Sequence, residues 1–183
     1  MFIYYIVLQC YNLSQIIISD ASTLVLLEKI DLLKTVIAKD KIIIPQKVYE
    51  EAVTKGIEKK AADAYNIKEY AERKKIEVRA IKDKGRFEKL LREFNLGDGE
   101  TEAVVLFIEH KADLLASDDH KAINLCKSLK IPFATAMAIT LKYIKEKEIA
   151  YEDGKTMILG LGKYGRYSSE LIADALGLIG EKE

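Results

Sequence analysis

The sequence has little cysteine and little histidine, with two of each among its 183 residues. It contains no Cys-x-x-Cys pair and no Cys/His cluster, so a zinc site of the usual kind has almost no ligands available. Cys10 and Cys126 lie far apart in the chain. We interpret both as small, reduced core residues, which is typical of a cytoplasmic protein.

The sequence also lacks an excess of either charge. Lys and Arg together number 29, Asp and Glu also number 29, and the formal net charge is therefore zero. This balance excludes a globally basic nucleic-acid binder but not a locally basic one. With 49% hydrophobic residues the chain is too apolar to be disordered, and it shows no self-similarity at a fixed period, which argues against a repeat array.

A long hydrophobic run is missing as well. The apolar stretch at residues 1–8 is far shorter than the ~20 residues that a membrane-spanning helix needs. It lacks the basic region and the small-residue cleavage site of a signal peptide. We therefore expect no membrane anchor. We expect residues 1–15 to form an N-terminal extension or an extra edge strand, and residues 16–183 to form one domain.

Short apolar runs alternate along this domain with helical patterns of 10 to 15 residues. The predicted strands cover residues 16–19, 42–44, 76–78, 114–116 and 132–134. This alternation predicts βαβ units and hence a parallel sheet covered by helices on both faces. We expect Ser22 to cap the first helix, Gly160, Gly162 and Gly165 to mark a bend, and Ser168 or Ser169 to cap the last helix.

Functional residues of parallel sheets collect at the carboxyl ends of the strands, and acidic residues stand there in this sequence. They are Asp20 after the first strand, Glu50 and Glu51 after the second, and Asp118 and Asp119 after the fourth. Any one of them could simply complement the dipole of the helix that it begins. Their recurrence at several strand ends indicates a shared site.

The helix that follows Gly99 allows a sharper test of which acids point toward the interior. At 100° per residue Glu100 lies in line with Val104 and Phe107 on the apolar face, whereas Glu102 lies on the opposite side. We therefore expect Glu102 at the surface and Glu100 toward the interior. A carboxylate in that position needs a pairing partner or a bound cation. The same arithmetic does not decide between Glu50 and Glu51.

Clustered carboxylates repel one another, and a hard divalent cation removes that conflict. A set of ligands made only of oxygen atoms favours Mg²⁺ or Mn²⁺. Several acids around such a cation are what metal-assisted hydrolysis of a phosphodiester requires, because the cation activates water and stabilises the charged transition state.

The segments IIISDASTLVLL, IIIPQKVYEEAV and LGDGETEAVVLFIEHKADLLASDD resemble the PIN-domain ribonucleases. They are most similar to the PIN-like subgroup of bacteria and archaea, which includes the toxins of toxin–antitoxin pairs. The resemblance covers about residues 16 to 180. It implies a PIN-like α/β three-layer sandwich, with a central parallel sheet and helices on both faces.

The resemblance also implies the residues of the site. The implied catalytic acids are Asp20, Glu51, Glu100 and Asp119, and the extra acid Asp118 could share the metal with Asp20, Glu100 and Asp119. Ser22 matches a small hydroxyl residue that supports the first acid. Ser117 stands where the family usually has threonine, two positions before the last acid, and we expect it to support the site as well.

One stretch of the chain is basic. Residues 55–92 hold 13 Lys and Arg against 7 Asp and Glu, a net charge of +6, and the rest of the chain is correspondingly acidic. This stretch is either a pair of solvated helices or an RNA-binding arm that contacts phosphates. For the second alternative we expect contacts from Arg73, Lys74, Lys75, Lys84 and Arg86. Lys121 could neutralise a phosphate or simply lie at the surface.

These observations favour a Mg²⁺- or Mn²⁺-dependent ribonuclease acting on single-stranded RNA. The resemblance implies a toxin with an antitoxin protein as partner, and a homodimer is common in the family. The alternative is a PIN-like module without efficient catalysis that binds RNA or a protein. A third hypothesis, a phosphoacceptor domain with Asp20 as nucleophile, is disfavoured because no second acid follows two residues after Asp20.

Overall fold

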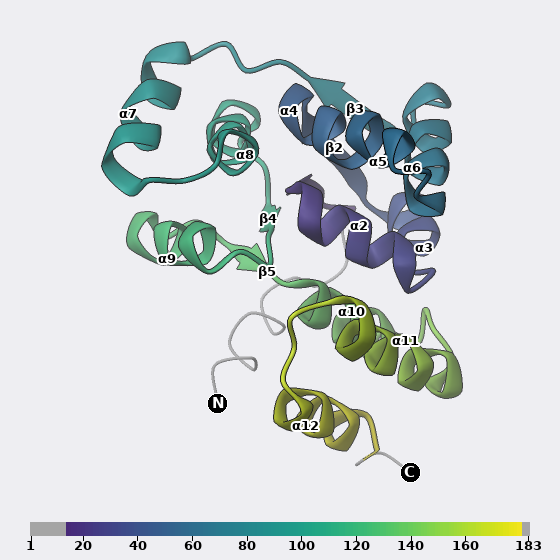
Figure 1. Ribbon diagram of the computed structural model, residues 1–183. Helices are drawn as coiled ribbons and strands as arrows, with labels where there is room; N and C mark the ends of the chain where they lie inside the picture. The colour runs from purple at the N-terminus through teal and green to yellow at the C-terminus, as the bar shows by residue number, and fades with distance from the viewer. Residues whose placement is uncertain (1–13, 181–183) are drawn as a thin grey trace.

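The structure, a computed structural model, describes residues 14–180 and contains a five-stranded sheet with all strands parallel (Figure 1). The order across the sheet is β3-β2-β1-β4-β5. The strands are β1 (Ile16–Ser19), β2 (Lys41–Pro45), β3 (Ile76–Arg79), β4 (Leu114–Ala116) and β5 (Phe133–Ala134). Each predicted strand is thus present within about two residues. The extension or extra strand expected for residues 1–15 falls almost wholly outside the described residues.

Helices connect the strands. Between β1 and β3 lie α2 (Ala21–Lys29), α3 (Leu33–Lys39), α4 (Gln46–Tyr49), the π-helical turn η1 (Glu50–Thr54), α5 (Lys55–Glu58) and α6 (Ala62–Glu72). They are followed by α7 (Lys84–Phe94), α8 (Asp98–His110), α9 (His120–Leu129), α10 (Ala136–Lys145), α11 (Tyr151–Tyr164) and α12 (Ser169–Gly180). No helix in this described part of the chain is long and apolar enough to cross a membrane.

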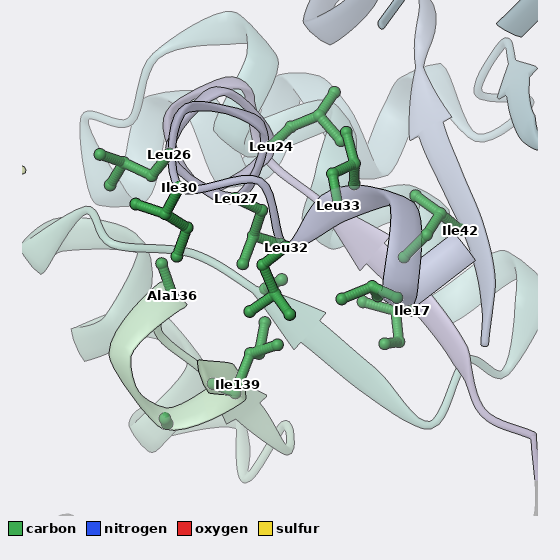
Figure 2. Close-up of a cluster of buried hydrophobic side chains, with 14 of the residues drawn as sticks. Ile17, Leu24, Leu26, Leu27, Ile30, Leu32, Leu33, Ile42, Ala136 and Ile139 are labelled. Carbon is green, nitrogen blue, oxygen red and sulfur yellow. The ribbon is translucent and has the colours of Figure 1, made fainter. Parts of the chain in front are cut away.

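Two hydrophobic cores lie on the two faces of the sheet because side chains alternate along each strand. Ile17 and its register partner Ile42 belong to one core, together with α2, α3, α10 and α11. Figure 2 shows Leu27, Leu32 and Leu33 gathered around Ile17 in this core. The next pair, Ile18 and Ile43, faces the other core with α8 and α9. Helices on both faces of a central parallel sheet confirm the predicted three-layer architecture.

The parallel strands give the sheet two distinct edges, which we call the carboxyl edge and the amino edge. Asp20, Glu50, Glu51 and residues 117–119 follow strands and therefore lie at or next to the carboxyl edge. Asp40 and residues 73–75 precede strands and lie at the amino edge. The topology alone thus brings the acids together and separates them from Arg73, Lys74 and Lys75.

Two details of the local structure differ from the sequence predictions. Asp20, not Ser22, caps α2, because its carboxylate accepts a hydrogen bond from the backbone N–H of Thr23. The bend expected at three glycines occurs only at Gly165, because Gly160 and Gly162 continue α11 without a break. Ser168 caps α12 as predicted, by accepting a hydrogen bond from the N–H of Leu171. Cys126 is a buried free thiol, as predicted, whereas Cys10 lies outside the described residues.

Candidate active site at the carboxyl edge

Asp20 is the most deeply buried acid at the carboxyl edge, with 3% of its surface exposed. Its Oδ1 accepts hydrogen bonds from the Ser22 hydroxyl at 3.0 Å and from the Thr23 N–H at 2.7 Å. Its Oδ2 accepts a hydrogen bond from the Ser117 hydroxyl at 2.5 Å. Burial raises the pKa of Asp20 to about 6, although the hydrogen bonds from Ser117 and Thr23 act to lower it. Two hydroxyls therefore orient this carboxylate.

Asp119 lies beside Asp20 through the same serine. The Ser117 Oγ accepts a hydrogen bond from the N–H of Asp119 at 3.2 Å while donating to Asp20. The Asp119 carboxylate caps α9, where its Oδ1 accepts hydrogen bonds from the N–H groups of Lys121 and Ala122. These bonds use one carboxylate oxygen and leave the other available to a ligand. Ser117 thus connects the acids that follow β1 and β4.

Glu100 brings a third acid to this site from the first turn of α8. Its Oε2 accepts a hydrogen bond from the N–H of Gly97 at 2.7 Å, and the residue is half-buried, as the helical phase predicts. Burial raises the pKa of Glu100, and the negative charges of Asp119 and Glu51 raise it further. The charge of Lys121 acts in the opposite direction. Asp119 and Glu51 are therefore close enough to Glu100 for their charges to raise its pKa.

Glu51, not Glu50, faces α8. A Cβ placed on Gly99 would lie only 3.0 Å from Oε2 of Glu51, so this glutamate lies directly against the start of α8. Glu50 instead forms an ion pair with Lys47 and is 45% exposed at its side chain. Both acids belong to the π-helical turn η1, which changes the helical phase where it occurs. Such turns are frequent at functional sites.

Asp118 differs from Asp119 in that both of its carboxylate oxygens accept hydrogen bonds from other parts of the protein. Its Oδ2 accepts hydrogen bonds from the Thr23 hydroxyl at 2.7 Å and from the N–H of Ala136 at 3.1 Å. Its Oδ1 accepts a short hydrogen bond from the hydroxyl of Tyr167. Each oxygen of Asp118 is therefore occupied by contacts that join β4, α2, α10 and the segment before α12, so we do not retain this acid among the metal ligands.

The chemistry of the donors fits a hard divalent cation. Asp20, Glu51, Glu100 and Asp119 present only carboxylate oxygens, which suit Mg²⁺ or Mn²⁺ better than a soft metal. Burial, and for Glu100 also neighbouring negative charge, raises the pKa of Asp20 and Glu100, so their charged forms are disfavoured and a bound cation would offset that cost. Within residues 14–180, no group of three Asp, Glu, His or Cys side chains is already gathered closely enough to hold a metal.

Glu102 does not lie free at the surface, and that prediction is wrong. It is partly buried, and its Oε2 accepts a hydrogen bond from the N–H of Lys47 at 3.0 Å, near the start of α4. The phase of α8 directs Glu102 away from the core that α8 covers. The N-terminus of α4 lies on that side of α8, so Glu102 is covered by it. This acid stabilises a helix N-terminus through its charge and its hydrogen bond.

The structure divides the predicted basic residues into two groups. Arg73, Lys74 and Lys75 lie at the amino edge, where Arg73 pairs with Glu69, so we do not retain them as contacts of an RNA bound at the acids. Lys84 and Arg86 are exposed on α7, which follows β3 and packs against α8. Figure 1 shows α7 projecting on the same side of the molecule as α8 and α9.

Two residues of this edge were not recognised in the sequence. Gly99 leaves room for the carboxylate of Glu51, which a Cβ at this position would crowd, and the Gly-Asp-Gly spacing was the available signal. Tyr167 contacts Asp118 across 49 residues of sequence, and no local pattern signals such a contact.

Lys121 was considered only as a phosphate contact or a surface residue. It donates a hydrogen bond from Nζ to the carbonyl oxygen of Asn95, and its charge reaches Glu100.

A parallel sheet between two helical layers, with acids from four separate segments at its carboxyl edge, defines an α/β domain with an acidic edge. A family model described as a PIN domain matches residues 16–181, which is most of the chain. The chain therefore belongs to the PIN-domain family, whose fold is of nuclease type. Comparison with curated proteins gave no match, and comparison with solved structures gave none either.

Proposed function

We propose that this protein is a Mg²⁺- or Mn²⁺-dependent ribonuclease that hydrolyses phosphodiester bonds of single-stranded RNA. The observation that supports the proposal most strongly is the convergence of the acids: Ser117 joins Asp20 to Asp119, and Glu51 lies against Gly99 beside Glu100. The pKa of Glu100 agrees with this, because burial raises it and the charges of Asp119 and Glu51 add to the rise. Acids that three separate segments bring so close are expected where a cation completes the site. Asp20 joins the group through Ser117.

In this proposal Asp20, Glu51, Glu100 and Asp119 hold the cation. When bound, the cation activates water for attack on phosphorus and stabilises the charge that develops on the phosphate. The protein's own contribution is orientation. Ser22 and Ser117 fix the Asp20 carboxylate, and the N–H groups at the start of α9 fix the Asp119 carboxylate. Gly97 fixes Glu100 in the same way.

Basic side chains near the acids would bind the RNA backbone. The exposed Lys84 and Arg86 of α7 and the Nζ of Lys121 on α9 carry positive charge on the side of the molecule where the acids lie. Contacts to phosphates give affinity without base specificity. The choice of RNA target therefore depends on other contacts or on a partner.

By its resemblance to the PIN-like subgroup, we further propose that the protein is the toxin of a toxin–antitoxin pair. An antitoxin protein would then be a partner, a homodimer of the kind common in the family would be one possible state, and the cytoplasm would be the site of action. A short DNA-binding protein encoded next to this chain would support the assignment.

The test is cleavage of a 5′-labelled, unstructured RNA by the purified full-length protein. We expect cleavage with Mg²⁺ or Mn²⁺ and none with excess chelator, and restored cleavage when metal is added back. Retained RNA binding without cleavage in any metal would favour a PIN-like binding module instead. Cleavage that persists in chelator would contradict the proposal directly.

A further inference from the structure

The carboxylate of Asp118 joins segments that are far apart in the sequence. It accepts hydrogen bonds from Thr23 in α2, from the first residue of α10, and from Tyr167 in the segment between α11 and α12. A carboxylate with several donors is held firmly, because hydrogen bonds to a charged group are strong and these act from three directions. Asp118 is therefore the point at which the C-terminal helices are attached to the carboxyl edge.

Tyr167 is positioned for this contact by its own surroundings. Its hydroxyl accepts a hydrogen bond from the N–H of Met137 at 3.1 Å while donating to Asp118. Its ring lies against Gly165, where a Cβ would be 2.8 Å from the ring carbon Cδ2. The rest of the ring packs against the core shared by α2 and α10. In Figure 1 the segment between α11 and α12 passes beside α10.

The residues on either side of Asp118 are the ones that organise the proposed site. Ser117 donates to Asp20, and Asp119 is one of the four acids. A displacement of Asp118 would move both neighbours, since all three are consecutive. Small displacements matter, because a misplacement of about 1 Å far from the reacting atoms can lower a rate by about 100-fold.

We propose that Tyr167 is a positioning residue for the proposed nuclease site, acting through Asp118 to hold Ser117 and Asp119 in place. This inference rests on the proposed function. It assigns a role to the C-terminal helices, which contribute none of the four acids. The hydroxyl of Tyr167, rather than the whole side chain, carries that role.

The chain offers a matched control. Tyr143 is a fully buried tyrosine, whereas Tyr167 is partly buried, and the Tyr143 hydroxyl likewise donates to an aspartate, in this case Asp40 at 2.7 Å. Asp40 lies at the amino edge, away from the acids. Tyr143→Phe therefore removes the same kind of hydrogen bond as Tyr167→Phe, and because Tyr143 is more deeply buried it should lose at least as much thermal stability.

The experiment compares wild type, Tyr167→Phe and Tyr143→Phe under saturating Mn²⁺, together with Thr23→Val, which removes the other side-chain donor to Asp118. We expect kcat to fall about tenfold or more in Tyr167→Phe with little change in KM, a loss in the same direction in Thr23→Val, and wild-type kinetics in Tyr143→Phe. Calorimetric titration with Mn²⁺ should show weaker binding by Tyr167→Phe than by Tyr143→Phe.

A double-mutant cycle with Asp118→Asn tests whether Tyr167 acts through Asp118. In a protein that already carries Asp118→Asn, the change Tyr167→Phe should reduce kcat by a smaller factor than it does in wild type. Equal factors in both backgrounds, or wild-type kcat and Mn²⁺ affinity in Tyr167→Phe, would overturn the inference alone. A wild-type protein that neither binds Mn²⁺ nor cleaves RNA would overturn the proposed function and this inference with it.

Discussion

The hydroxyl of Ser117 donates a hydrogen bond to Oδ2 of Asp20 at 2.5 Å, across 97 residues of sequence. The contact is possible because β1 and β4 are adjacent parallel strands, in which Ser19 is paired with Ala116. The same oxygen of Ser117 accepts a hydrogen bond from the N–H of Asp119. One hydroxyl group thus sets the relative positions of two acids in the proposed site.

Removal of this hydroxyl should impair cleavage without unfolding the protein. We expect Ser117→Ala to cleave RNA about 10- to 100-fold more slowly, because Asp20 loses a donor that orients it. Ser117→Thr retains the hydroxyl and should keep most of the activity. Single-turnover rates measure the effect, with Ser128→Ala as control because the Ser128 hydroxyl donates to a carbonyl of its own helix. Wild-type rates in Ser117→Ala would show that the hydroxyl has no positioning role.

The burial of Asp20 predicts an unusual dependence of stability on pH in the metal-free protein. Its pKa of about 6 lies above the usual 3.8, so folding favours the neutral carboxyl group. The stabilisation is complete below pH ~4 and is lost as the pH rises through 6, with a magnitude of the order of 3 kcal/mol.

Asp20→Asn isolates this effect. The free energy of unfolding is measured by urea denaturation in the presence of chelator. It should be larger for Asp20→Asn than for wild type at pH 7, and the difference should shrink toward pH 4. Contributions from groups that do not interact with Asp20 are common to both proteins and cancel in the comparison. Asp174→Asn, at an exposed position in α12, should show no such trend. A difference that is independent of pH would mean that Asp20 ionises normally.

The strands were predictable because runs such as Ile16–Ile18 and Ile42–Ile44 are apolar on both faces and fit only a sheet covered on both sides. Their parallel arrangement then brought Asp20 and Asp119 to one edge. The half-buried position of Glu100 agrees with the phase of its helix, although Glu102 at the opposite phase is partly buried as well.

Features that depend on a neighbouring element were not predictable in this way. The position of Glu102 is set by the start of α4, which no helical wheel of α8 contains. The helical phase did not decide between Glu50 and Glu51, which both lie in a π-helical turn, and only the resemblance implied Glu51. The number of basic residues in 55–92 does not say where in the fold each one lies. The structure places residues 73–75 at the amino edge, before β3, and α7 after the carboxyl end of β3.

Gly99 provides a test of the position of Glu51. In Gly99→Ala the new Cβ would lie 3.0 Å from the Glu51 carboxylate, which must move. We expect a clear loss of cleavage, while alanine's higher helix propensity of up to ~1 kcal/mol limits any loss of stability. In the control, Gly177→Ala, the Cβ meets no atom within 4 Å. That variant should gain about 0.5 to 1 kcal/mol and keep full activity. Full activity in Gly99→Ala would place Glu51 outside the site.

The two groups of basic residues predict different responses to salt. Replacement of Lys84, Arg86 and Lys89 on α7 by Gln removes up to three phosphate contacts. The slope of log affinity for single-stranded RNA against log salt should therefore decrease in magnitude by about 2. The same replacement of Arg73, Lys74 and Lys75 at the amino edge should leave the slope unchanged. The measurement is RNA binding at several salt concentrations in Ca²⁺, provided that this metal does not support turnover. The reverse result would place the RNA at the amino edge.

The most direct measurement is the single-turnover rate of RNA cleavage in saturating Mn²⁺ by wild type and variants of the carboxyl edge. Asp20→Asn, Glu100→Gln and Asp119→Asn should each lose nearly all activity while remaining folded, because each removes a proposed ligand of the cation. Glu102→Gln should stay active, because its amide oxygen can still accept the hydrogen bond from Lys47. Activity retained in Glu100→Gln and Asp119→Asn would contradict a cation-dependent nuclease site built from these acids.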